Sequence, residues 1–242
     1  MKFTTLLLIT LITANVYGQE EQSNIPTPKD RKVLIGINFS PKRYYRTLKN
    51  NDGSTSSDEM IKSLNGEETP IILADIGINV CYKFKKHIGF ETGIQYSNKG
   101  YATLGTPLQW GFPGSPVSTL SYVYNYYYLD IPAKINFTFG NKKMRFITSA
   151  GITTNILIKA TATEFIDNPG GQSESSTQQS TNNYKKIDLS PTISAGIDYK
   201  IKKRMSLRIE PIFRYGILKI IDKPVTVYLW DVGINFGFYF AL

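Results

Sequence analysis

The last seventeen residues of the chain decide the fold: Thr226-Val-Tyr-Leu-Trp-Asp-Val-Gly-Ile-Asn-Phe-Gly-Phe-Tyr-Phe-Ala-Leu242. The even positions of this stretch are almost all large and apolar. The odd positions from Asp231 onward are mostly small or polar. Because successive side chains of a strand point to opposite faces, the alternation predicts a β-strand with one apolar face and one small or polar face.

The same period of two recurs along most of the chain. We expect eight strands, over residues 33–46, 70–84, 88–102, 120–139, 144–163, 186–201, 204–219 and 225–242.

The connections between these segments alternate in length. Three of the odd-numbered ones are long (47–69, 103–119 and 164–185), and 220–224 is a short exception. The even-numbered ones are tight and basic: Lys85-Lys86-His87, Gly140-Asn141-Lys142-Lys143 and Lys202-Lys203. An antiparallel up-and-down barrel produces this pattern, with every tight turn at one end. An even strand number places both ends of the barrel at that same end.

The alternation alone leaves open which face points inward. A soluble exported barrel or sandwich, with its apolar face inside, is the alternative to a transmembrane barrel. Two features favour the transmembrane form: glycines on the polar face suit a crowded interior, and aromatic residues collect at the strand ends. The mean hydropathy of −0.20 then averages a lipid-facing surface, a polar interior and hydrophilic loops. The fold class is therefore predicted as all-β, an eight-stranded transmembrane barrel of the outer membrane.

The N-terminal segment has the features of an export signal. Lys2 precedes an apolar stretch over residues 6–12, and small residues follow up to Gly18. We expect a cleavable signal peptide over 1–18, a periplasmic lead over 19–32 and the barrel over 33–242. A retained N-terminal anchor is the alternative. Export together with a transmembrane barrel predicts location in the cell outer membrane of a Gram-negative organism.

Three stretches resemble the small outer-membrane β-barrel proteins of the Bacteroidetes, the PorT-like family, whose broader architectural relatives are the OmpX and OmpA barrels. They are the terminal Gly233-Ile-Asn-Phe-Gly-Phe-Tyr-Phe240, Tyr128-Leu-Asp-Ile-Pro132 and Gly89-Phe-Glu-Thr-Gly93. Asp130 stands where the family has Glu, and the chain ends on Leu242 where such barrels usually end on Phe or Trp. The resemblance implies insertion by the barrel-assembly machinery and no catalytic residues.

Opposed charges fall on the face predicted to be interior. An eight-stranded barrel is only wide enough for side chains to fill it, so we expect these charges to neutralise one another in a plugged lumen. A proton or ion path is the alternative. The residues are Asp75, Glu91, Asp130, Lys134, Arg145, Asp188, Arg208, Glu210, Arg214 and Asp231.

The sequence offers little for catalysis or metal binding. Its only histidine, His87, lies in a tight turn, and its only cysteine, Cys81, falls on the inward face. A nucleophile, a base and an orienting group within reach of one another are therefore not expected at the outer rim. We predict no enzyme, no catalytic residue, no cofactor and no metal site.

The net charge of +9 gathers at the tight turns, which hold ten of the 28 lysines and arginines. Contact with phosphates of outer-membrane lipid explains this placement, and a dock for an acidic periplasmic protein is the alternative. Nucleic acid is not an expected partner.

The long loops differ in composition. Loop 47–69 is acidic, and loop 164–185 is rich in Ser, Thr, Gln and Asn and is expected to be mobile. Trp110 and Phe112 in loop 103–119 form a candidate contact site, or else fold back over the barrel mouth. Tyrosines over 122–128 indicate that the fourth strand projects above the membrane.

These observations predict a non-enzymatic barrel that presents extracellular loops in a structural or interaction role. The alternatives are an accessory component of a secretion or assembly complex, as the resemblance suggests, and a narrow pore or small-ligand transporter.

Overall fold

The computed structural model describes residues 32–66, 68–109, 117–140 and 142–242. The predicted signal peptide, almost all of the predicted lead, and both Trp110 and Phe112 lie outside the described residues. The elements are β1 (Val33–Asn50), α2 (Thr55–Gly66), β2 (Glu68–Lys83), β3 (Ile88–Thr103), β4 (Thr106–Gln109), β5 (Val117–Phe139), β6 (Met144–Asp167), β7 (Ser173–Gln179), η1 (Thr181–Asn183), β8 (Ile187–Lys202), β9 (Met205–Tyr215) and β10 (Val225–Ala241).

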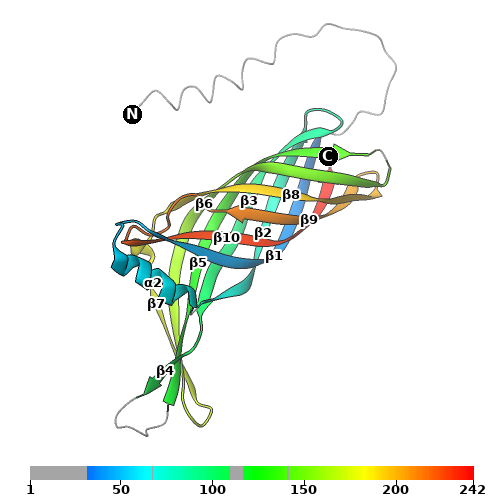
Figure 1. Cartoon of the computed structure of the whole chain (residues 1–242). Helices are drawn as coiled ribbons and strands as arrows, with labels where there is room; N and C mark the ends of the chain where they lie inside the picture. The colour runs from blue at the N-terminus through cyan, green and yellow to red at the C-terminus, as the bar shows by residue number, and fades with distance from the viewer. Residues whose placement is uncertain (1–31, 67, 110–116, 141) are drawn as a thin grey trace, which may run out of the picture. The chain divides into compact units, whose positions relative to one another are not determined.

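Eight of the strands form a closed ring, as predicted (Figure 1). Neighbours around the ring pair antiparallel in the order β1-β2-β3-β5-β6-β8-β9-β10. The first and last strands close it, with paired residues from Leu34 and Ala241 to Asn50 and Val225. This closure removes the exposed edges that an open sheet would have.

The polar face is the inner one. In β1 the buried residues include Asn38, Ser40 and Lys42, whereas Ile37 and Phe39 between them are exposed. The other ring strands repeat this arrangement, so the outer surface of the barrel is a continuous apolar band. A soluble barrel would show the reverse pattern, and the transmembrane form is the one observed.

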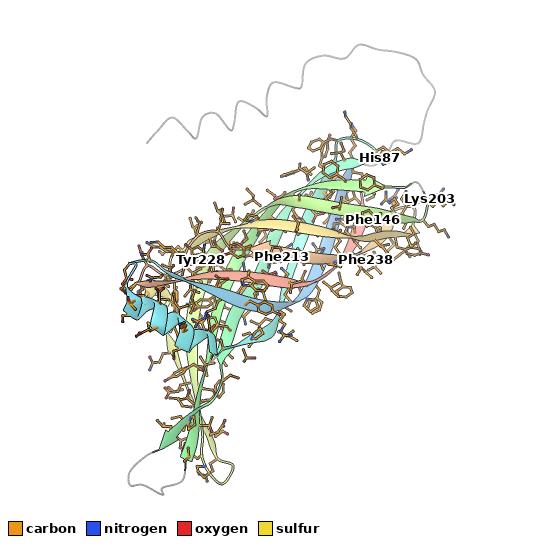
Figure 2. All side chains as sticks on the ribbon, in the orientation of Figure 1. His87, Phe146, Lys203, Phe213, Tyr228 and Phe238 are labelled. Atoms are coloured by element: carbon orange, nitrogen blue, oxygen red, sulfur yellow. The ribbon has the colours of Figure 1, made fainter. Side chains whose placement is uncertain are left out.

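Aromatic residues lie at both ends of this band (Figure 2). Tyr228 lies towards the end with the long connections, which we call the long-loop end. Phe146 and Phe238 lie towards the other end, where His87 and Lys203 mark the tight turns. We call this second end the tight-turn end. Aromatic girdles at the two ends of an apolar band are typical of outer-membrane barrels.

A close approach inside the barrel explains two of the glycines. The ring of Tyr239 lies over Gly36 and Gly237, where an added Cβ would come within 2.5 Å of ring carbons in each case. The other face of the ring is covered by the Arg208 guanidinium, whose carbon lies 4.1 Å from the ring centroid. Glycine is therefore required at both positions for this large side chain to fill the narrow interior.

The long connections contain more structure than the sequence indicated. The loop prediction for 47–69 was wrong in part, because β1 continues to Asn50 and α2 follows. The Ser54 hydroxyl accepts a hydrogen bond from the Ser57 backbone N–H and so caps the helix. Gly53, at φ +70°, makes the turn that precedes it.

The connection over 164–185, which we expected to be a mobile loop, also contains strand structure. β6 continues to Asp167 and pairs with β7 across a turn. Gly170 and Gly171 have positive φ, as tight hairpin turns require. Within loop 103–119, β4 pairs with the first four residues of β5. These strands extend the barrel wall as β4-β5-β6-β7, which we call the projecting sheet (Figure 1).

The seventh predicted strand is shorter than expected and ends at Tyr215 rather than at residue 219. The Leu218 backbone N–H donates to the Asp188 carboxylate, and the side chain of Ile220 is buried. The backbone beyond Tyr215 still bonds to both neighbouring strands, through Gly216 to Leu229 and Ile217 to Leu189, but the regular ladder stops where Leu218 bonds to a side chain instead.

No helix in the described part of the chain is long and apolar enough to cross a membrane.

Candidate functional site

The lumen contains a cluster of charges centred on Arg214. Its guanidinium lies 2.5 Å from Asp75, 2.9 Å from Asp130 and 3.2 Å from Asp231. These carboxylates come from three different strands, β2, β5 and β10. Lys42 lies 2.6 Å from Asp75, and Lys99 lies 3.3 Å from Asp130. We call these six residues the Arg214 cluster; its three cations balance its three carboxylates.

A second cluster lies around Glu91. One carboxylate oxygen of Glu91 lies 2.9 Å from the Lys134 ammonium, and the other lies 2.6 Å from the Arg208 guanidinium. Arg208 is also 3.9 Å from Glu210, its neighbour two residues along β9. Asn136 donates a hydrogen bond of 2.8 Å to Glu91. We call Glu91, Lys134, Arg208 and Glu210 the Glu91 cluster; it too is neutral.

The structure thus brings eight of the ten sequence-predicted interior charges into two clusters. Arg145 belongs to neither and pairs with Asp198 near the tight-turn end. Asp188 accepts hydrogen bonds from Asn155 and from two backbone N–H groups. Each of these side chains is largely or wholly removed from solvent.

Sequence reasoning missed Lys42, Lys99 and Asp198 as interior charges. The alternation along each strand placed all three on the inner face. Lys42 shares its parity with the buried Asn38 of β1, Lys99 with Glu91 of β3, and Asp198 with Asp188 of β8. A strict count by twos along each strand would have found them.

Apolar side chains fill the lumen at the long-loop end. We call this cluster the aromatic plug; its buried members are Tyr101, Tyr126, Tyr128, Leu157, Ala160, Ile220, Val227 and Leu229. Tyr184 packs edge-on against Tyr126, with 5.1 Å between the ring centroids. The Arg46 guanidinium covers the Tyr101 ring at 4.1 Å. The plug and the two clusters fill successive levels of the lumen with side chains.

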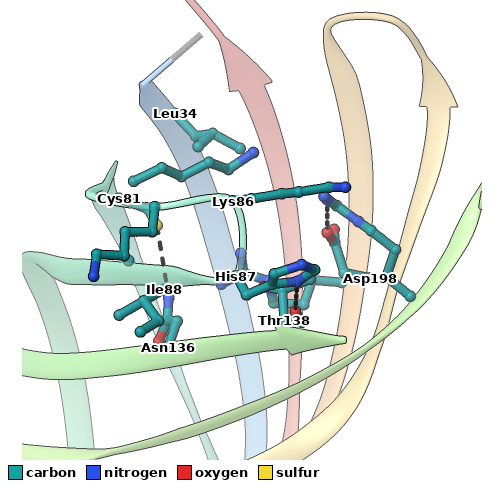
Figure 3. A pocket seen from close by; sticks show the side chains of 13 residues that line it. Leu34, Cys81, Lys86, His87, Ile88, Asn136, Thr138 and Asp198 are labelled. Atoms are coloured by element: carbon teal, nitrogen blue, oxygen red, sulfur yellow. Dashed lines mark hydrogen bonds and ion pairs between the residues drawn. The ribbon is translucent and has the colours of Figure 1, made fainter. Parts of the chain in front are cut away.

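Two small cavities remain in the lumen of the described barrel: one, beside Lys134 and Arg214, lies between the two clusters, and the other opens at the tight-turn end (Figure 3). The volume of this second cavity is about 10 Å³, which admits about one water-sized group. Its polar and charged lining includes Lys83, Lys85, Lys86, His87, Asn136, Arg145, Asp198 and Arg208. We call this the basic mouth. Lys86 extends across it towards Asp198 (Figure 3).

His87 and Cys81 both line the mouth, and each is hydrogen-bonded to a different neighbour. His87 Nδ1 lies 2.7 Å from the Thr138 carbonyl oxygen, so this nitrogen carries the proton and donates it. The buried Cys81 sulfur accepts a hydrogen bond from Asn136 at 3.6 Å. In the part of the chain described, no group of three or more His, Cys, Asp or Glu side chains could hold a metal ion.

The fold and its sites can be set beside known proteins. No curated protein sequence matches the chain. Among solved structures, Neisserial surface protein A aligns over 87% of this chain and 97% of its own, with 10% identity and a TM-score of 0.45. OprG from Pseudomonas aeruginosa aligns over 87% and 97%, with 13% identity and a TM-score of 0.40. Ail from Yersinia pestis aligns over 85% and 97%, with 15% identity and a TM-score of 0.32.

The family assignment comes from the sequence itself. The profile of the family described as the outer membrane protein beta-barrel domain matches residues 19–222, most of the chain. The matched region includes the first seven strands of the ring. The chain therefore belongs to the outer membrane protein beta-barrel domain family, and its eight-stranded barrel resides in the outer membrane.

Proposed function

We propose that this protein is a non-enzymatic barrel that presents structure outside the cell and conducts nothing through its lumen. The observation that carries the proposal is the filling of the lumen by two neutral charge clusters and the aromatic plug. A barrel of eight strands has no room for both this filling and an aqueous channel.

We place the tight-turn end in the periplasm and the long-loop end outside the cell, because outer-membrane barrels have short periplasmic turns and longer external loops. The surface offered to a partner is then the projecting sheet together with α2. β7 is exposed along its whole length and pairs only with β6 among the described strands. Such a sheet supports an interaction or structural role.

The absence of enzymatic activity is part of the same proposal. In the described residues the one histidine lies at the tight-turn end, remote from the projecting sheet, and its Nδ1 is bonded to a backbone carbonyl. Cys81 lines the same mouth, but its sulfur is hydrogen-bonded to Asn136 rather than to His87, so the pair is not arranged as a base and its nucleophile.

Planar-bilayer recording tests the closed lumen. The purified barrel should give no steady conductance, and the double variant Tyr126→Ala/Tyr184→Ala should still give none, because the Arg214 cluster lies below the plug. A steady conductance from the unaltered protein would contradict the proposal and favour a pore. A matched variant in the projecting sheet, Thr177→Ala, controls for preparation artefacts.

An accessory role in an outer-membrane secretion or assembly complex, as in the PorT-like family of the Bacteroidetes, is the second candidate. The basic turns at the proposed periplasmic end are the feature that favours it. Cross-linking and co-purification from the native membrane separate the two. A secretion accessory co-purifies with a large assembly, whereas a free-standing barrel does so only transiently with the assembly machinery.

A further inference from the structure

The basic mouth has more positive charge than its own carboxylates balance. Lys83, Lys85 and Lys86 line it, and none of them forms an ion pair with another described residue. Asp198 is the one lining carboxylate, and it is already paired with Arg145. The charges of the two lumen clusters cancel within the clusters, so the excess at the mouth is a local feature.

The basic mouth is also lined by residues with buried polar atoms that have no hydrogen-bond partner. Nε of Arg145 and Nε of Arg208 are buried donors that have no hydrogen-bond partner among the described residues. Oδ1 of Asn136 and Oδ1 of Asp198 are buried acceptors that likewise have no hydrogen-bond partner among the described residues. All four side chains line the mouth, and Arg208 is only 3% exposed. A ligand that satisfies these atoms must both accept and donate hydrogen bonds.

We propose that the basic mouth binds hydrogen phosphate, with one phosphate oxygen in the cavity and the rest of the ion between Lys85 and Lys86. Arginine and lysine are the side chains that recognise phosphate oxygens most strongly. Hydrogen phosphate accepts from the two arginine donors and offers its single O–H to the Asp198 oxygen, the charged one of the two acceptors. Sulfate and the phosphodiester of a lipid headgroup carry no such proton at neutral pH, so both leave the Asp198 oxygen unsatisfied.

The test uses the full-length barrel in a neutral maltoside detergent, which has no phosphate of its own. Inorganic phosphate is titrated at pH 7 by calorimetry, and sulfate and a short-chain phosphatidylglycerol are titrated in parallel. We expect saturable phosphate binding at one site, and affinities at least about tenfold weaker for sulfate and for the phosphodiester.

Two matched variants locate the site. Lys85→Gln/Lys86→Gln removes two charges from the mouth, and phosphate affinity should fall by at least about tenfold. Lys202→Gln/Lys203→Gln removes two charges from another tight turn whose residues do not line the mouth, and affinity should fall by less than about threefold. Unboiled against boiled gel mobility shows that each variant is folded.

Three results would overturn the proposal. One is the absence of phosphate binding, which leaves the cavity to a single water molecule. Another is an equal loss of affinity in both lysine pairs, which indicates diffuse charge. The third is equal or tighter binding of sulfate or phosphatidylglycerol, which shows that the buried acceptors do not select a protonated anion.

Discussion

At the scale of single residues, Arg214 is the most highly connected charge in the lumen. It joins carboxylates from three strands that are distant in sequence and is itself almost completely buried. Transferring one charge out of water is costly, and the attraction of its partners repays the cost only while every partner is present. The side chain therefore fixes how β2, β5, β9 and β10 meet inside the barrel.

Replacing Arg214 by Ala should lower the free energy of unfolding by about 3–5 kcal/mol, because three carboxylates are left buried with only two lysines. Urea unfolding in lipid vesicles, followed by tryptophan fluorescence, measures the change. The double variant Arg214→Met/Asp231→Asn, which removes one charge of each sign, should recover part of the loss. A cost below about 1 kcal/mol in the single variant would show that the cluster is hydrated rather than dry.

The sequence predicts which residues are interior but not which of them are partners. Parity along a strand places Asp75, Asp130 and Arg214 inside the barrel. Their contact depends on strand tilt and stagger around the ring, which no local pattern encodes. Asp198 is an example. In the strand register it lies opposite Arg208 on β9 and opposite Arg145 on β6, and its ion pair is with Arg145.

At the scale of elements, the strands follow from period two, whereas the contents of the long connections do not. α2 is polar and short, and its presence depends on a turn whose side chains bond to the backbone. β7 consists entirely of exposed polar residues, a composition typical of loops, and it is a strand because β6 lies beside it. Tertiary context therefore determines both elements.

The start of α2 should respond to acid. The Ser54 N–H donates to Asp52, and this hydrogen bond holds the pKa of the Asp52 carboxyl below its ordinary value of 3.8. Because the folded pKa is depressed, the carboxylate stabilises the turn fully above pH 3.8, and that contribution is lost as pH falls through the lowered pKa. The protection of the α2 amides, that is, their exchange rate relative to an unstructured peptide at the same pH, should fall in that window.

The matched variant for this effect is Asp52→Asn, which should exchange faster than the native protein at neutral pH and lose the acid dependence. NMR titration of the Asp52 carboxyl gives the pKa directly. A carboxyl that titrates at or above its ordinary value, with α2 exchange unchanged in Asp52→Asn, would show that the turn does not depend on this bond.

At the scale of the whole molecule, the outer surface is what distinguishes this barrel from a soluble one. Ile37, Ile78 and Ile94 are paired across β1, β2 and β3, and each is more than half exposed. An apolar row of this kind is unfavourable in water and favourable against lipid acyl chains. The projecting sheet continues the same wall, and its strand β7 consists only of exposed polar residues, so we expect lipid to end at the base of this sheet.

The position of this boundary can be tested by comparing how much a lysine on either side of it lowers the free energy of unfolding. Ile78→Lys introduces a charge at the middle of the apolar row, and it should lower the free energy of unfolding in lipid vesicles by about 2–4 kcal/mol. Val117→Lys places the same charge on an exposed position of the projecting sheet, where the cost should stay within about 0.5 kcal/mol. Denaturant titration of the two variants in the same vesicles measures the difference. Equal costs would mean that lipid covers both positions or neither, and would place the membrane boundary elsewhere than at the base of the projecting sheet.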